Sequence, residues 1–84
     1  MVTKNEFTLT LHTDQQTLNN VPIRSLQAVT TEGAFGLLKG HQPVLASLSS
    51  GVVTYIDTND KTHTLGVSGG ILASDGYTAT LMAN

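Results

Sequence analysis

The chain has 84 residues, a formal net charge of −2, 12% charged residues and no cysteine. A chain of this length forms one domain, residues 1–84, with one modest hydrophobic core, and its share of charged residues is about half of the roughly 25% that is usual. Its four basic residues are scattered singly, which excludes nucleic acid and anionic membrane surfaces as partners. The lack of cysteine excludes disulfides and cysteine-ligated zinc.

The N-terminal segment has the pattern of a strand. In EFTLTLHT the apolar Phe7, Leu9 and Leu11 alternate with polar residues, which is typical of a half-buried strand. No basic segment precedes an apolar run, and no apolar run approaches the roughly 18 residues of a membrane span. We therefore expect a cytosolic protein without direct membrane insertion, which can still associate with a membrane complex.

The middle of the chain is predicted to form short strands and turns. One strand covers residues 24–30 and is bulged near Leu26. The segment EGAFGLLKGHQPVLASLSSG that follows is too interrupted for a helix and too apolar for a solvated linker. Its glycines Gly33, Gly36 and Gly40 permit positive φ or close backbone approach, and Pro43 holds Gln42 extended. His41 is thereby placed in a rigid turn between two apolar runs.

Two hairpins are predicted in the last third of the chain. The first joins residues 52–57 to residues 62–68 through a turn at 58–60, because Asn and Asp bond their own backbone and tolerate left-handed geometry. The second has Asp75-Gly76 as a two-residue type I′ turn. This register places Tyr77, Ala79 and Leu81 on the inner face of its second strand.

Strand-forming residues extend over the whole chain. Thirteen threonines, many in T-x-T steps, suit a pleated surface because β-branched side chains are stiff there. Nowhere do apolar residues keep a helical period over a long segment. We predict an all-β fold, a two-sheet β-sandwich of about eight to ten short strands with no substantial helix.

No pattern predicts an active site, a cofactor or a metal. The glycine-rich GVSGGILASDG lacks the Gly-Lys-Ser/Thr of a phosphate-binding loop, so a hairpin corner explains it better. The acidic residues form no pair for general acid–base catalysis, and His12, His41 and His63 lack metal-ligand spacing. For His41 three interpretations stay open: a hydrogen bond to turn carbonyls, a polar anchor in a protein–protein interface, or catalysis and metal binding.

The motifs resemble those of a known family. The stretch EGAFGLLKGHQPVLASLSSGVV, followed by VSGGIL and the terminal TLMAN, is similar to the β-sandwich domain of the epsilon subunit of F-type ATP synthases, called delta in mitochondria. G-H-x-P together with a later S-G-G makes the resemblance specific, and FTLTLHTDQQTL fits the family's first strand and turn. Many members continue into a two-helix C-terminal arm, and we expect a short form that lacks it.

The resemblance implies a non-catalytic subunit that clamps the gamma central stalk to the c-ring, so that ion-driven rotation is coupled to ATP synthesis. It implies a peripheral location on the cytoplasmic face of the bacterial inner membrane. The residues that it places against gamma are Thr13, Leu18, His41, Gln42 and Pro43, and those against the c-ring are Glu32, Gly33, Ala34 and Phe35. The alternative is an autonomous binding module, adhesin-like or ice-binding, that uses the T-x-T rows.

Overall fold

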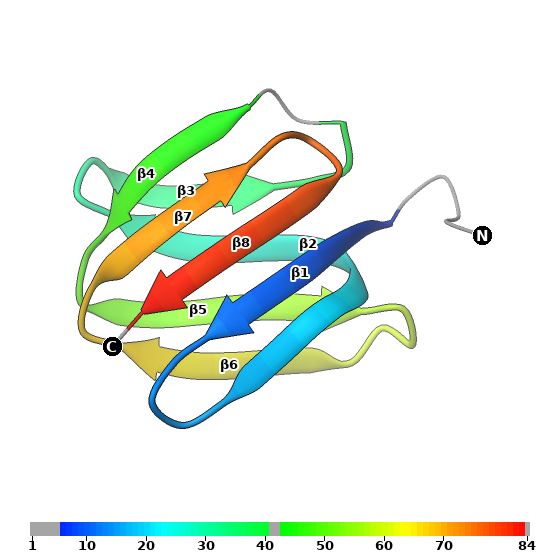
Figure 1. Ribbon diagram of the computed structural model, residues 1–84, viewed down its shortest axis with the longest axis horizontal. Helices are drawn as coiled ribbons and strands as arrows, with labels where there is room; N and C mark the ends of the chain where they lie inside the picture. The colour runs from blue at the N-terminus through cyan, green and yellow to red at the C-terminus, as the bar shows by residue number, and fades with distance from the viewer. Residues whose placement is uncertain (1–5, 41–42, 84) are drawn as a thin grey trace.

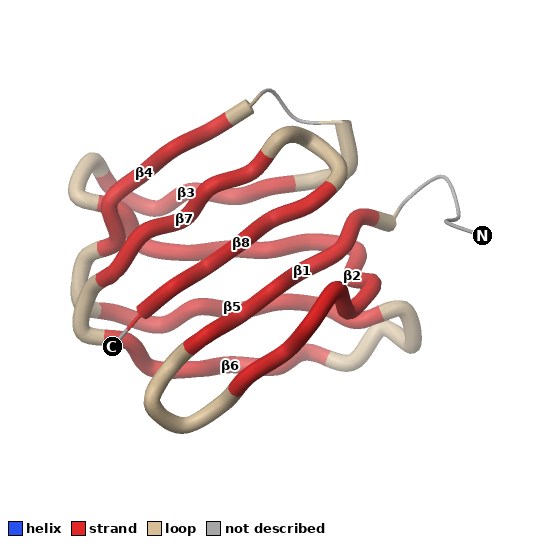
Figure 2. Tube along the Cα trace, viewed as in Figure 1, coloured by secondary structure: helices blue, strands red, loops and turns tan. Residues whose placement is uncertain are grey.

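The computed structural model describes residues 6–40 and 43–83, and these residues form eight strands and no helix. The strands in chain order are β1 (Phe7–His12), β2 (Thr17–Thr30), β3 (Gly33–Leu37), β4 (Val44–Leu48), β5 (Gly51–Asp57), β6 (Thr62–Val67), β7 (Gly70–Ser74) and β8 (Thr78–Ala83). Figure 2 shows that strands make up most of the trace. The predicted all-β class is confirmed. Within the described ranges no helix is long and apolar enough to cross a membrane.

The strands form two layers packed face to face, and the long strand β2 belongs to both (Figure 1). The first layer, here the β1 sheet, contains the N-terminal half of β2, then β1, β8, β7 and β4. The second layer, here the β5 sheet, contains β3, the C-terminal half of β2, β5 and β6. A single pairing of Thr30 with Leu48 joins β4 to β2 and closes one corner. The predicted two-sheet sandwich is therefore confirmed.

The core lies between the two layers. On β1 the alternation predicted from sequence holds, because Phe7, Leu9 and Leu11 are at most 1% exposed. The other layer contributes apolar residues from β2, β3, β5 and β6. Within residues 6–40 and 43–83 the buried apolar residues are Phe7, Leu9, Leu11, Ile23, Leu26, Ala28, Leu37, Leu48, Val53, Tyr55, Val67, Leu72, Ala79 and Leu81.

Strand β2 begins earlier than predicted and bends twice. Its N-terminal half contains Asn19, Asn20 and Pro22, which are poor strand formers. Asn20 has a positive φ of 51° where the register with β1 shifts, and its backbone N–H donates to the Thr10 hydroxyl at 3.2 Å. A second shift lies at Arg24, where β2 passes from one layer to the other. The bulge predicted near Leu26 is thus displaced, since Leu26 is a core residue in regular pairing.

The connection between β7 and β8 corrects two predictions. Gly76 has a positive φ of 100°, but the other loop residues do not, and a type I′ turn needs two such residues. The Asp75 carboxylate accepts the backbone N–H groups of Tyr77 and Thr78 at 2.9 Å each and so holds a longer loop. Tyr77 consequently lies in the loop and is 64% exposed, whereas Ala79 is buried as predicted.

Candidate interaction surfaces

Charged side chains are nearly absent from the strands. Among the eight described strands, β2 contains Arg24, β5 contains Asp57, and the others contain no Asp, Glu, Lys or Arg. The register places Asp57 opposite Ile23, so both charges lie at one end of the molecule. The outer faces of both sheets are therefore nearly free of formal charge. Such faces lose little solvation when a partner covers them, since no charge is buried.

The outer face of the β1 sheet carries large apolar side chains, and we call it the neutral face. Leu45, Ile71 and Met82 are 79%, 53% and 60% exposed. Ile71 lies directly opposite Met82 on β8, and Ser47, two residues after Leu45, lies opposite Ile71 on β4. Cross-strand and diagonal neighbours on one sheet face are within contact range. These exposed apolar side chains make the neutral face a candidate interaction surface.

A block of threonines lies beside this patch on the neutral face. Thr8 pairs with Thr78 and Thr10 with Thr80 across the parallel β1–β8 ladder. The Thr8 hydroxyl donates to the Thr78 hydroxyl at 3.3 Å. Strand propensity explains these residues without a further role, because β-branched side chains pack well on a pleated surface. Among the described residues of the neutral face, the threonine rows that an ice-binding module would use are confined to two strands, β1 and β8.

The residues predicted to face gamma lie at two separate places. The Thr13 hydroxyl accepts the backbone N–H groups of Gln15 and Gln16 at 3.2 and 3.0 Å and thereby shapes the β1–β2 turn. Leu18 pairs with Leu11 and packs partly against the core. Pro43 is exposed before β4, at the opposite end of the β1 sheet, while His41 and Gln42 lie outside the described residues. The neutral face extends between these two places (Figure 1).

The residues predicted to face the c-ring lie in the turn between β2 and β3 and in the first part of β3. The Thr30 hydroxyl donates to the Gly33 carbonyl at 2.9 Å and accepts the Glu32 backbone N–H at 3.2 Å. Gly33 has a φ of 121°, a conformation that favours glycine. Glu32, Gly33 and Ala34 are exposed, whereas Phe35 packs partly against the core. The structure thus brings the first three together at an exposed tip and turns Phe35 inward.

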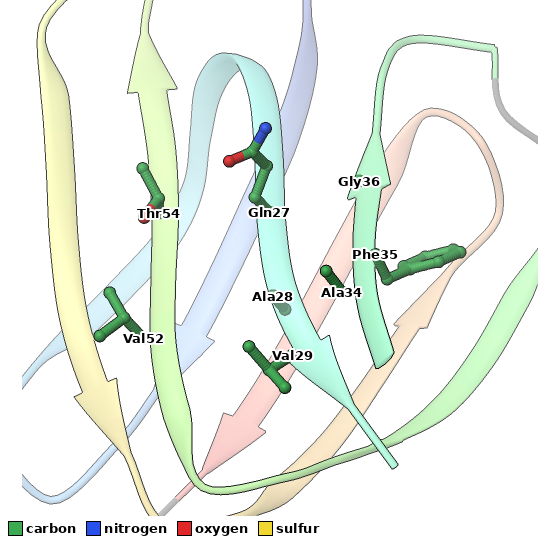
Figure 3. A pocket seen from close by; sticks show the side chains of 8 residues that line it. All are labelled: Gln27, Ala28, Val29, Ala34, Phe35, Gly36, Val52 and Thr54. Atoms are coloured by element: carbon green, nitrogen blue, oxygen red, sulfur yellow. The ribbon is translucent and has the colours of Figure 1, made fainter. Parts of the chain in front are cut away.

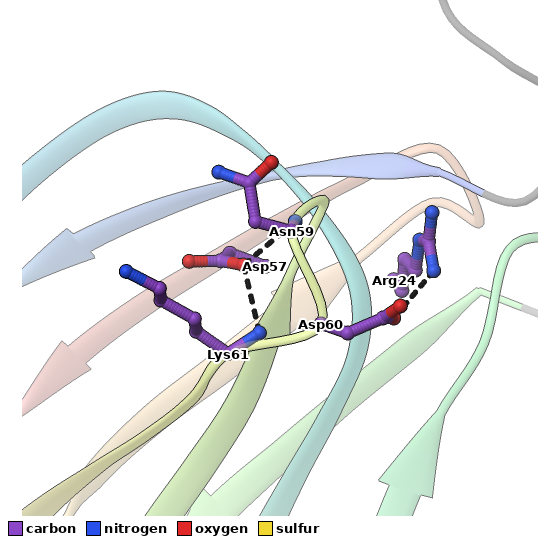
Figure 4. A network of polar contacts seen from close by, with 5 residues as sticks. All are labelled: Arg24, Asp57, Asn59, Asp60 and Lys61. Carbon is purple, nitrogen blue, oxygen red and sulfur yellow. Dashed lines mark hydrogen bonds and ion pairs between the residues drawn. The ribbon is translucent and has the colours of Figure 1, made fainter.

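The β5–β6 hairpin was predicted correctly and is held by a polar network (Figure 4). Asp57 Oδ1 accepts the backbone N–H groups of Asn59 and Lys61 at 2.8 and 3.0 Å, and Asp57 Oδ2 lies 2.8 Å from His63 Nε2. The hydrogen bond with His63, and then those with the backbone, lower the pKa of Asp57 to about 2. Arg24 forms an ion pair with Asp60 and ties the turn to β2.

This network is a structural feature of the turn. The His63 ring stacks on Tyr55 with centroids 4.8 Å apart, which orients the imidazole toward Asp57. Within residues 6–40 and 43–83 no group of three His, Cys, Asp or Glu side chains could hold a metal ion. The Asp57–His63 pair was not predicted from the sequence, because His63 lies directly opposite Tyr55 and reaches Asp57 only diagonally across the hairpin.

Comparison with known sequences identifies relatives of this chain. Residues 6–84 match the model of a family described as ATP synthase, Delta/Epsilon chain, beta-sandwich domain. The ATP synthase epsilon chain of Chlorobaculum tepidum is 36% identical over 76 residues, which are 90% of this chain and 86% of that protein. The ATP synthase epsilon chain of Rhodococcus opacus is 41% identical over 59 residues, which are 69% of this chain and 48% of that protein.

Comparison with solved structures agrees with the fold. A chain of the Euglena gracilis mitochondrial ATP synthase superposes with a TM-score of 0.87 at 22% identity, covering 94% of this chain and 51% of that one. A chain of the Tetrahymena thermophila mitochondrial ATP synthase central stalk and c-ring gives 0.71 at 14% identity, covering 92% and 62%. The fold is shared at these low identities, and the family match extends over almost the whole sequence. This chain therefore belongs to the family of ATP synthase delta/epsilon chain β-sandwich domains.

Proposed function

We propose that this chain is a non-catalytic epsilon-type subunit of an ATP synthase rotor, in which it couples the gamma central stalk to the c-ring. The observation that carries the proposal is the family match over residues 6–84, together with relatives that are ATP synthase epsilon chains. A subunit that transmits torque must be stiff, and a close-packed sandwich supplies that stiffness. Its location is then peripheral, on the cytoplasmic face of the bacterial inner membrane.

Gamma is assigned to the neutral face and its two ends. A partner that contacts Thr13 and Leu18 at one end and Pro43 at the other must cover the sheet between them. Covering an apolar side chain of this size completely stabilises a complex by about 1.5–3 kcal/mol. Leu45, Ile71 and Met82 are the exposed side chains that supply this energy. His41 and Gln42, which precede Pro43 in the sequence and lie outside the described residues, are assigned to the same contact.

The c-ring is assigned to the tip formed by Glu32, Gly33 and Ala34, with Phe35 behind it. This tip and the β1–β2 turn lie at the same end of the strands (Figure 1). The hydrogen bonds of Thr30 to the turn backbone restrict its motion, and the Thr30 side chain is itself nearly buried. A tip held in this way transmits force to the body of the sandwich instead of bending.

Reconstitution tests this proposal. A rotor of gamma and c-ring, prepared without epsilon, is titrated with this chain, and binding and ions pumped per ATP hydrolysed are measured. We expect saturable binding and a higher pumping ratio. Leu45→Asp places a charge in the neutral face and should weaken binding at least about tenfold, since burying an unpaired charge is costly. The matched control Thr64→Asp, at an exposed position of β6, should bind like the unmodified chain.

Two results would contradict the proposal. Failure of the unmodified chain to bind the rotor would remove the assigned function. Equal weakening by Leu45→Asp and Thr64→Asp would keep the function but remove gamma from the neutral face.

A further inference from the structure

Gly36, in β3, has no local reason to be glycine. Its φ is outside the left-handed region, and a Cβ built on it would meet its nearest atoms at 3.9 and 4.0 Å, which is ordinary contact. Gly70 differs, because a Cβ there would lie 2.2 Å from the Met82 carbonyl oxygen. A glycine inside a strand weakens the strand and can mark a place where another backbone approaches closely. No contact within the described chain requires the missing side chain of Gly36.

Strand β3 is also an unprotected edge. It pairs with β2 in regular register, and no described strand pairs with its other side. Its sequence GAFGL contains no charge and no proline, and its pairing with β2 has no bulge, although natural edge strands use such devices against pairing with another chain. The N-terminal half of β2 is an exposed edge with these devices, namely Pro22 and the bulge at Asn20.

A shallow trough lies on the outer face of the β5 sheet, over β2 and β3. Two cavities of about 320 and 270 Å³ share Gln27 and Gly36 in their linings and so form one depression along the strand. Figure 3 shows the first cavity between β3, β2 and β5, lined also by Ala34, Val52 and Thr54. The depression exists because Gly36 has no side chain and that of Ala34 is small. Its lining contains no charged residue.

We propose that the open edge of β3 receives an extended segment of the gamma subunit, which adds one strand beside residues 35–37, clear of the Glu32 tip, and lays uncharged side chains over Gly36 into the trough. Backbone hydrogen bonds to a sheet edge give affinity in this mode, and the pockets beside the edge select the side chains. The trough excludes charged side chains, because it offers them no partner of opposite charge. This inference rests on the proposed rotor function. Gamma is the partner because β3 runs from the Glu32 tip, assigned to the c-ring, to the end from which the chain leads to Pro43, assigned to gamma (Figure 1).

A glycine replacement separates folding from binding. Gly36→Val fits the isolated domain, since the space for Cβ exists and valine favours strands, so the melting temperature should stay the same or rise. The same side chain fills the trough, and affinity for the gamma and c-ring complex should fall at least tenfold. The matched control is Gly66→Val on the edge strand β6, where a Cβ would meet nothing within 4 Å. This control should fold equally well and bind like the unmodified chain.

Hydrogen exchange gives an independent measurement. Among residues 35–37, the backbone amides that point away from β2 should exchange at least tenfold more slowly in the rotor than in the isolated chain, because a new strand protects the outer edge of β3. Unchanged binding of the Gly36→Val chain, or unprotected β3 amides in the rotor, would overturn the added strand while the rotor function stands. Failure of the unmodified chain to bind would instead overturn the proposed function, and this inference with it.

Discussion

The outer faces of the two sheets are both nearly uncharged, but they offer a partner different groups. The neutral face of the β1 sheet projects large apolar side chains, with Leu45 79% exposed. The outer face of the β5 sheet has small residues at Ala34 and Gly36 beside an open backbone edge. The first can bind through buried side-chain area and the second through backbone hydrogen bonds. One small sandwich can thus hold one partner by two distinct chemistries.

The largest effect is expected from a core substitution that destabilises both sheets, and with them both outer faces. Leu81 is 0% exposed in the core between the layers. Leu81→Ala deletes buried methyl groups and leaves a cavity, which should lower the free energy of unfolding by about 2–5 kcal/mol. Chemical denaturation of the isolated chain measures this loss. Loss of rotor binding with unchanged stability would show that Leu81 acts at a surface and that the faces do not share one core.

The next largest effect is on rotor affinity, which substitutions on the two outer faces should change by different amounts. Ile71→Ala removes part of an apolar side chain that gamma is proposed to cover, so binding should weaken by about 1–2 kcal/mol, a part of the burial energy of isoleucine. Stability of the isolated chain should hardly change, because Ile71 is 53% exposed. The control is Val52→Ala on the β5 sheet, where backbone contacts are expected to dominate, and its effect on affinity should be smaller. Isothermal titration onto the rotor compares the two, and an equal loss would remove the distinction between the faces.

The strands that follow a regular alternation could be predicted from the sequence. Phe7, Leu9 and Leu11 identify β1 because burial of one face imposes a period of two. The N-terminal half of β2 could not be recognised, since Asn20 and Pro22 are local strand breakers and the strand exists through long-range pairing with β1. Local preference was overruled there by tertiary contacts.

The interaction surfaces were less predictable than the fold. Glu32, Gly33 and Ala34, which the motif predicts to contact the c-ring, lie together at an exposed tip, but the exposed apolar side chains of Leu45, Ile71 and Met82 were not predicted. Each of these residues stands in a short apolar run, and only the pairing shows which residue of a run faces outward. The inward orientation predicted for Tyr77 was wrong for a different reason, because the Asp75 hydrogen bonds hold Tyr77 in a loop and β8 begins only at Thr78.

A smaller effect concerns the loop that joins β7 and β8, within the β1 sheet. Asp75→Ala removes the acceptor of two backbone N–H groups, so the free energy of unfolding should fall by about 1 kcal/mol, the usual net worth of such bonds at an exposed site. Asp75→Asn keeps an acceptor oxygen and should lose less. Thermal unfolding of both variants measures the difference, and equal losses would mean that the carboxylate charge, not its hydrogen bonding, stabilises the loop.

The smallest expected effect distinguishes the two sheets by their response to acid. The pKa of Asp57 is lowered from 3.8 to about 2 in the folded chain, chiefly by the hydrogen bond with His63. Folding therefore favours the ionised carboxylate, and the stability that it contributes is present above about pH 4 and is lost as the pH falls toward 2. The Asp57 side chain is 21% exposed, so solvent screens the interaction and keeps its contribution small.

In this acidic range the β5–β6 turn should open before the β1 sheet loosens. Protonated Asp57 is a weaker acceptor for the Asn59 and Lys61 backbone N–H groups, whereas the strands β1, β4, β7 and β8 contain no acidic side chain to protonate. Hydrogen exchange, corrected for the intrinsic effect of pH, should show these two amides losing protection first. Asp57→Asn should remove that pH dependence. At neutral pH the turn amides of this variant should exchange as readily as those of the unmodified chain do in acid. Simultaneous loss of protection in both sheets would show that Asp57 does not stabilise its turn separately, and that acid acts on the sandwich as one unit.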